Sequence, residues 1–160
     1  MILYYSRTRK TEVVAKALHT LTGLPLHALT SDIDGARGLS FIWKAMRGAM
    51  GAKGNPVGNI PADLPKEIYL CGPIWAGEAA GPLKYFIANA DLRRTKVHAV
   101  LTARMPTAQY QKVPGKLLER VGATPGEVFL LATAKELPES DVVMEHLREW
   151  LSGFAPVEGP

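Results

Sequence analysis

Short apolar runs alternate along the chain with segments in which apolar residues recur every three or four positions. The apolar run at residues 2–5 stops abruptly, and Val13, Val14 and Ala17 then begin a helical pattern. Strands are expected at residues 2–5, 25–29, 67–71, 96–102 and 127–132. Helices are expected at residues 11–22, 81–90, 108–121 and 140–151. Gly72-Pro73 is expected to end the third strand.

Strands that alternate with helices predict an α/β fold with a parallel sheet covered on both faces, a three-layer α-β-α sandwich. For five strands the common order is 2-1-3-4-5. We expect one domain over residues 1–152, followed by a C-terminal tail at 153–160. This order brings three loops to one edge of the sheet, at residues 6–11, 72–81 and 102–110.

The first of these loops is rich in hydroxyl and basic side chains: Ser6, Arg7, Thr8, Arg9, Lys10 and Thr11. It joins a buried strand to a helix, whose first N–H groups and dipole attract anions. The loop therefore predicts a phosphate site. Thr8 or Thr11 is expected to cap the helix.

The second loop holds Trp75 between Gly72 and Gly77, directly after a buried strand. A rigid aromatic side chain at this edge suits stacking on a planar ring. It also suits a purely structural role in covering the end of the sheet. In the third loop, Arg104 has two possible roles, to balance negative charge on a ligand or to lie in solvent.

Composition narrows the function classes. The 160 residues are 47% hydrophobic and 21% charged, with a net charge of +4, no long basic run and no nucleic-acid motif. A lone cysteine, Cys71, in an apolar run fits a reducing compartment. With no apolar stretch long enough to span a bilayer and no room for a signal peptide, we expect a cytoplasmic protein that binds neither membrane nor nucleic acid.

Other candidate chemistry is weak. The four histidines lack metal-ligand spacing, so we expect no metal site. Ser6 has no visible acid–base partners for a hydrolase triad. Trp43, with Lys44 and Arg47, forms either a lid or partner surface or, as we favour here, an amphipathic helix with the indole packed on the domain.

Taken together, the loops resemble those of the flavodoxin-like family. The first resembles its phosphate loop, Ser/Thr-x-Thr-Gly-x-Thr, and residues 72–77 resemble its second flavin loop. The resemblance implies noncovalent FMN binding, with the phosphate held by residues 6–11 and the isoalloxazine beside the second and third loops. The flavin-contacting residues implied there are Pro73, Ile74, Trp75, Ala76, Gly77, Thr102, Ala103, Arg104 and Met105.

Two departures from the family pattern leave alternatives open. Arg9 stands where the family has glycine, and the third loop lacks the usual small turn. The resemblance implies electron transfer with a redox partner protein, or FMN-dependent reduction of a small acceptor. The alternatives are a fold that has lost FMN and serves as a binding or regulatory module, and a protein that binds another phosphorylated ligand.

Overall fold

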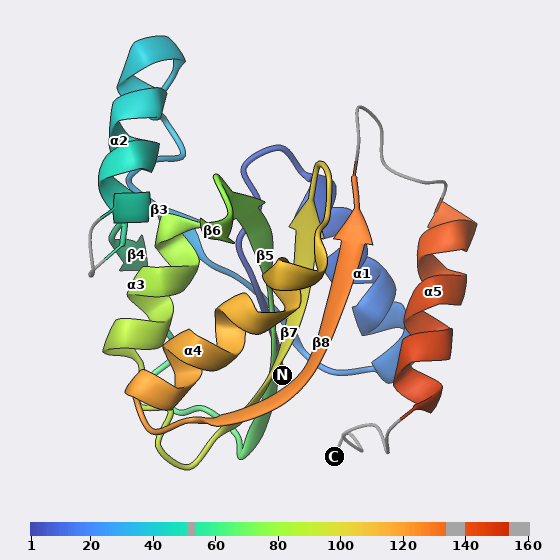
Figure 1. Ribbon diagram of the computed structural model, residues 1–160. Coiled ribbons are helices and arrows are strands. Elements are labelled where there is room, and N and C mark those ends of the chain that lie inside the picture. The colour runs from blue at the N-terminus through green and yellow to red at the C-terminus, as the bar shows by residue number, and fades with distance from the viewer. Residues whose placement is uncertain (51–53, 134–139, 154–160) are drawn as a thin grey trace.

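The computed structural model describes residues 1–50, 54–133 and 140–153 (Figure 1). Five parallel strands form the main sheet in the order β2-β1-β5-β7-β8, which confirms the predicted order 2-1-3-4-5. These strands are β1 (Ile2–Tyr4), β2 (Leu26–Ala28), β5 (Glu67–Trp75), β7 (Lys96–Ala103) and β8 (Thr124–Ala132). Short strands β3 (Thr30–Ser31) and β4 (Val57–Gly58), which the pattern did not predict, form a separate antiparallel pair.

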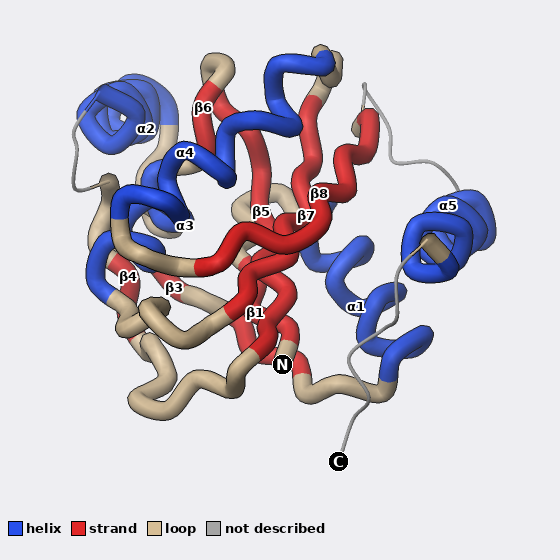
Figure 2. The backbone as a smooth tube through the Cα atoms, turned by 60° about the horizontal axis from the view of Figure 1, so that its bottom comes forward, coloured by secondary structure: helices blue, strands red, loops and turns tan. Residues whose placement is uncertain are grey.

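Helices cover both faces of the sheet, as the alternating pattern predicts (Figures 1 and 2). On one face α1 (Lys10–Thr22) packs against α5 (Ser140–Ser152). On the other, α3 (Gly81–Asn89) contacts both α2 (Gly38–Met50) and α4 (Val113–Arg120), which follows the short 3-10 helix η1 (Ala108–Lys112). In both views α2 lies at the outer margin of the molecule, beyond α3.

The core lies in two layers, one on each side of the sheet, because successive strand residues point to opposite faces. Along β1, Ile2 belongs to the layer under α1 and α5, and Leu3 to the layer on the other face. Cys71 is fully buried in the first layer, and burial raises the pKa of its thiol. The thiol is therefore protonated and packs as a small apolar side chain.

The prediction that Gly72-Pro73 ends the third strand is wrong. Strand β5 continues to Trp75 and turns back as β6 (Glu78–Ala79). The Pro73 carbonyl accepts the N–H of Ala80 at 3.0 Å, so the edge of Pro73 that lacks an N–H also faces β6. Because β1 pairs with β5 only as far as Cys71, proline removes no bond to β1 there.

Helix α2 is regular, and it has apolar side chains on two faces. Phe41 and Ala45 pack on the domain, whereas Trp43 is exposed. The favoured prediction that Trp43 packs on the domain is therefore wrong. No helix in the described part of the chain combines the length and the apolar character needed to cross a bilayer.

Candidate functional site

A cavity of about 170 Å³ lies at the carboxyl edge of the sheet, where the arrowheads point in Figure 1. All three predicted loops contribute to it, together with α2 and the residue that follows β8. Its lining consists of Ser6, Arg7, Thr8, Lys10, Thr11, Phe41, Pro73, Ile74, Trp75, Thr102, Ala103, Arg104 and Thr133. The sequence therefore placed the three loops correctly around one hollow.

Some predicted residues do not line this cavity. Arg9 and Met105 are exposed, and Ala76 and Gly77 form the turn between β5 and β6. Phe41 and Thr133 line the cavity and were missed. Thr133 follows the last strand at the same edge, which is a signal that sequence analysis could have used. The apolar residues of α2 occur on two faces, so the pattern alone did not select Phe41.

The amino end of α1 is unusual because its N-cap residue is Arg9, with a positive φ of 63°. Its side chain makes no capping hydrogen bond, so the prediction that Thr8 or Thr11 caps the helix is wrong. Thr11 instead lies in the first turn, with its side chain buried. The first N–H groups of a helix have no partner within it, so they are donors for a ligand at this end.

Three cationic side chains line the cavity, and no carboxylate of the described residues does. Arg7 donates from Nη2 to the carbonyl of Ala36 at 3.0 Å, and its guanidinium lies 3.6 Å from the centre of the Phe41 ring. Lys10 donates from Nζ to the carbonyl of Thr133 at 2.8 Å. Arg104 is the third cation and is exposed. The electrostatic environment therefore favours an anion.

The Arg7 side chain has one buried nitrogen that makes no hydrogen bond to any described residue. Nε of Arg7 makes no hydrogen bond within the described part of the chain. A buried donor of this kind is costly unless something accepts from it. The orphaned donor and the surplus of positive charge both fit a site for an anionic group.

Two hydroxyls connect the first and third loops. Oγ1 of Thr11 and Oγ1 of Thr102 lie 2.8 Å apart, and both residues are buried. Either hydroxyl can be the donor, and the proton of the accepting hydroxyl is then available to another acceptor. The pair thus fixes the two loops and leaves one donor at the cavity.

Trp75 belongs to an aromatic cluster at the wall of the cavity. Its ring meets Tyr5 edge to face at 5.9 Å between centroids, and Phe41 at 5.6 Å. Tyr5 donates from its hydroxyl to Asp34 at 2.8 Å, and burial, followed by this bond, raises the pKa of Tyr5. Trp75 is half-buried by this packing, so it covers the end of the sheet and also lines the cavity.

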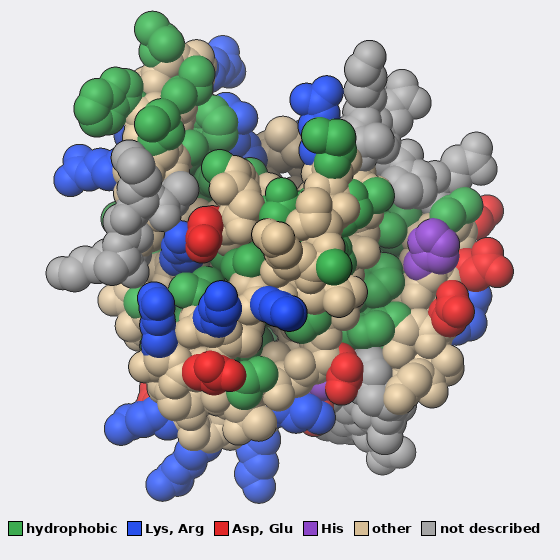
Figure 3. All heavy atoms as spheres, in the orientation of Figure 1, with side chains coloured by type: hydrophobic (Ala, Val, Ile, Leu, Met, Phe, Trp, Pro, Cys, Tyr) green, Lys and Arg blue, Asp and Glu red, His purple; other side chains and the backbone are tan. Residues whose placement is uncertain are grey.

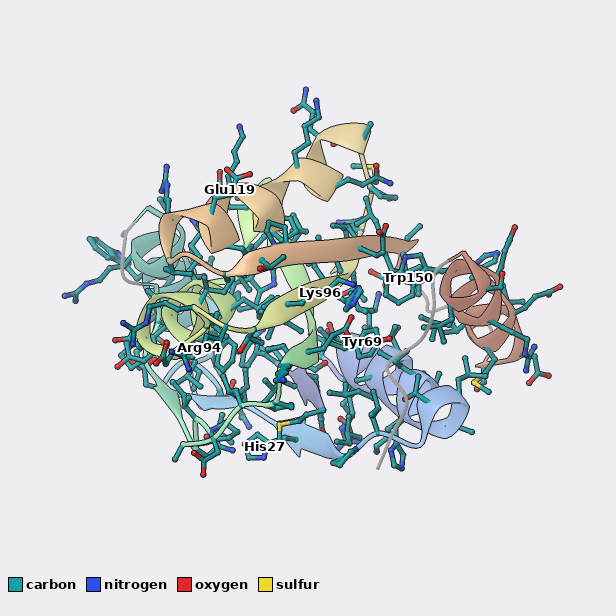
Figure 4. All side chains as sticks on the ribbon, turned by 90° about the horizontal axis from the view of Figure 1, so that it is seen from below. His27, Tyr69, Arg94, Lys96, Glu119 and Trp150 are labelled. Carbon is teal, nitrogen blue, oxygen red and sulfur yellow. The ribbon has the colours of Figure 1, made fainter. Side chains whose placement is uncertain are left out.

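A second polar cluster lies near the amino ends of β5 and β7, away from the cavity. His98 is fully buried, and its Nε2 lies 2.5 Å from Oε1 of Glu67, while its Nδ1 accepts the N–H of Glu127 at 3.0 Å. Tyr69 stacks on His98. Trp150 of α5 meets Tyr69 edge to face, and these two residues are labelled in Figure 4. Since Nδ1 accepts a hydrogen bond, Nε2 carries the ring proton and donates a hydrogen bond to Glu67.

Five parallel strands in this order define a flavodoxin-like fold. The three loops surround a hollow beside β1, where the strand order reverses and where such sheets bind ligands. Comparison with solved structures supports this assignment. A protein of Bacteroides eggerthii DSM 20697, provisionally described as a flavoprotein, matches with a TM-score of 0.72 and 18% identity, over 97% of this chain and 96% of that one.

Two further structures have the same fold. A flavoprotein from Lactobacillus acidophilus NCFM, solved in complex with FMN, matches with a TM-score of 0.62 and 18% identity, over 81% of this chain and 90% of that one. The two-electron reduced flavodoxin of Megasphaera elsdenii matches at 0.51 and 13% identity, over 92% and 99%. No protein-family model and no curated protein sequence matches the chain.

Proposed function

We propose that this protein binds FMN noncovalently in the cavity and serves in electron transfer or in the reduction of a small acceptor. The observation that carries the proposal is the cavity at the amino end of α1, which Arg7, Lys10 and Arg104 line and no carboxylate of the described residues does. The FMN complex of the similar Lactobacillus acidophilus flavoprotein supports the same ligand.

In this proposal the phosphate lies at the amino end of α1. The N–H groups of the first turn, together with the hydroxyls of Ser6 and Thr8, are its donors, and Lys10 adds positive charge. Arg7, which also lines the cavity, adds a further positive charge. The hydroxyl left free in the Thr11–Thr102 pair donates to a further ligand oxygen.

The flavin ring lies against the second and third loops in this proposal. Trp75, Ile74 and Pro73 form an apolar wall that excludes water, and the edge contacts from Tyr5 and Phe41 hold the indole in place. The isoalloxazine would supply the redox chemistry, and the protein binds and orients it. A redox partner protein or a small acceptor then exchanges electrons at the exposed edge of the site.

Arg9 does not argue against this ligand. Its backbone has the positive φ that glycine adopts readily, so the loop keeps the course that the family pattern requires. Its side chain is exposed and does not line the cavity, so it does not fill the space for the ligand.

The test is a titration of the apo-protein with FMN, followed by the quenching of flavin and tryptophan fluorescence. Riboflavin, which lacks the phosphate, is titrated in parallel. We expect FMN to bind at least about tenfold more tightly than riboflavin, because charge-assisted hydrogen bonds hold the phosphate. Trp75→Ala should weaken both ligands, whereas the matched variant Trp150→Phe, away from the cavity, should bind both like the parent protein.

Three outcomes would contradict the proposal. If neither flavin binds, the chain is a flavodoxin-like binding or regulatory module. If FMN fails to bind but other phosphate esters shift the melting temperature, the same cradle serves another phosphorylated ligand. Equal affinity for FMN and riboflavin would show that the amino end of α1 does not bind the phosphate.

A further inference from the structure

Helix α2 presents a stripe of large apolar side chains to solvent. Leu39 is 79% exposed, Trp43 75%, Met46 53% and Ile42 50%. These positions follow the spacing of one helix face, while Phe41 and Ala45 pack inward. Figure 3 shows hydrophobic side chains gathered on this helix at the upper left of the molecule, beside Lys and Arg. Water contact at four large apolar side chains in a row is unfavourable unless a partner covers them.

The segment that carries the stripe has charged residues of one sign only. Residues 35–62 contain Arg37, Lys44, Arg47 and Lys53 and no acidic residue. Lys44 pairs with Asp32 at 3.8 Å, while Arg37 and Arg47 are exposed. Two copies of this helix face would bring like charges together, so self-association is disfavoured. A surface that covers the stripe must therefore offer apolar groups to the stripe and negative charge to the basic residues beside it.

We propose that α2 (Gly38–Met50) is an interfacial helix that binds the surface of a bilayer containing anionic lipids. A helix with Leu, Ile, Trp and Met on one face and basic residues beside it lies in the plane of the bilayer, at the headgroup boundary. It requires no membrane-spanning segment, so the expectation of no membrane binding, which rested on the lack of such a segment, does not apply to it. At 13 residues α2 is about 20 Å long.

The position of α2 makes this contact possible. The helix lies at the outer margin of the molecule, so a flat surface can reach it (Figures 1 and 2). A further exposed apolar side chain, Met105 (76% exposed), lies in the third loop at the carboxyl edge of the sheet, next to Arg104. Because Phe41 of the same helix lines the cavity, a protein bound through α2 holds its cavity close to the bilayer.

The experiment is flotation of the protein with vesicles of phosphatidylcholine alone and with vesicles that also contain phosphatidylglycerol. We expect binding to the anionic vesicles, reduced by added salt, and little binding to phosphatidylcholine. Trp43→Ser and Arg47→Glu should each lower the affinity for anionic vesicles about tenfold. The matched variants Val142→Ser and Arg148→Glu, on exposed positions of α5, should bind like the parent protein.

Brominated lipids give an independent readout, because bromine quenches only indoles within the bilayer. Quenching should occur in the parent protein and disappear in Trp43→Phe. No binding to anionic vesicles, equal binding by Trp43→Ser and the parent, or a dimer in sedimentation that Trp43→Ser dissociates would each overturn the proposal. FMN titration of Trp43→Ser separates the two proposals: vesicle binding requires no flavin, and loss of vesicle binding leaves flavin affinity unchanged.

Discussion

The hydroxyls of Thr11 and Thr102 form a buried pair, 2.8 Å apart, between the first turn of α1 and the end of β7. Their residues are 91 positions apart in the sequence. A buried hydroxyl is stable only with a partner, so each side chain requires the other. The pair therefore sets the distance between two of the loops that surround the cavity.

Thr102→Val should lower the free energy of unfolding by about 1–3 kcal/mol, because it leaves the buried Thr11 hydroxyl without a partner. The double variant Thr11→Val/Thr102→Val should recover part of this loss. Urea denaturation measures both effects. Thr20→Val, at an exposed position on α1, is the matched control and should change stability by less than about 0.5 kcal/mol. Additive losses in the double variant would show that the two hydroxyls do not depend on each other.

Arg9→Gly should raise the free energy of unfolding by about 0.5–1 kcal/mol. Arginine at a φ of 63° is strained, and glycine removes the strain, although it also makes the unfolded chain more flexible. Arg148→Gly on α5 is the matched control, and it should lower stability by about 1 kcal/mol because the residue lies inside a helix. Opposite signs in thermal or urea unfolding support the left-handed backbone at Arg9. Destabilisation by both would contradict it.

Ala76→Asn should stabilise the protein by about 0.5–1 kcal/mol. Ala76 and Gly77 connect the paired residues Trp75 and Glu78, and both have a positive φ, 50° and 85°, as a type I′ turn requires. Asparagine tolerates this conformation better than alanine. Gly77→Ala puts a second Cβ into the turn and should destabilise it. A lower melting temperature for Ala76→Asn would mean that this turn has another geometry.

Glu67 should make stability depend on pH in the acid range. Burial raises its pKa, but hydrogen bonds from His98 and Lys96 together outweigh burial and hold the pKa of Glu67 below its ordinary value of 4.5. A carboxyl whose pKa is lower in the folded state stabilises the fold above the unfolded pKa. This contribution is lost as the pH falls through the folded pKa.

Glu67→Gln should therefore be less stable than the parent at neutral pH, and the difference should shrink as the pH falls below 4.5. Urea unfolding at a series of pH values measures it. Glu119→Gln on α4 is the control, because Glu119 is exposed and lies away from this cluster (Figure 4). A difference between Glu67→Gln and the parent that stays constant with pH would show that the carboxylate charge is not what stabilises the fold.

Much of the fold could be predicted because its signals are local and repeated. Apolar runs and helical spacing predicted the five main strands, and their order followed as the common one for five parallel strands. That order brought the three loops together. What the sequence could not give depends on neighbours in space. Pro73 was expected to end a strand, yet β1 has already ended beside it, so its missing N–H removes no bond to β1.

The same limit applies to the site. Trp43 and Phe41 lie two positions apart on an apolar helix, and only the packing of α2 on the domain decides which one is buried. The capping prediction assigned a hydroxyl to the amino end of α1. In the structure the N-cap is Arg9, whose backbone is left-handed. Because arginine rarely adopts this conformation, the residue type gave no sign of it.

Phe41 gives α2 a further property. Its ring contacts Trp75 and Arg7 in the cavity, while its helix carries the exposed apolar stripe. If attachment at the stripe shifts this ring, the two binding equilibria are thermodynamically linked. By reciprocity, the factor by which an occupied cavity changes vesicle affinity equals the factor by which vesicles change ligand affinity. One aromatic side chain would then make the cavity sensitive to whether the protein is attached to a surface.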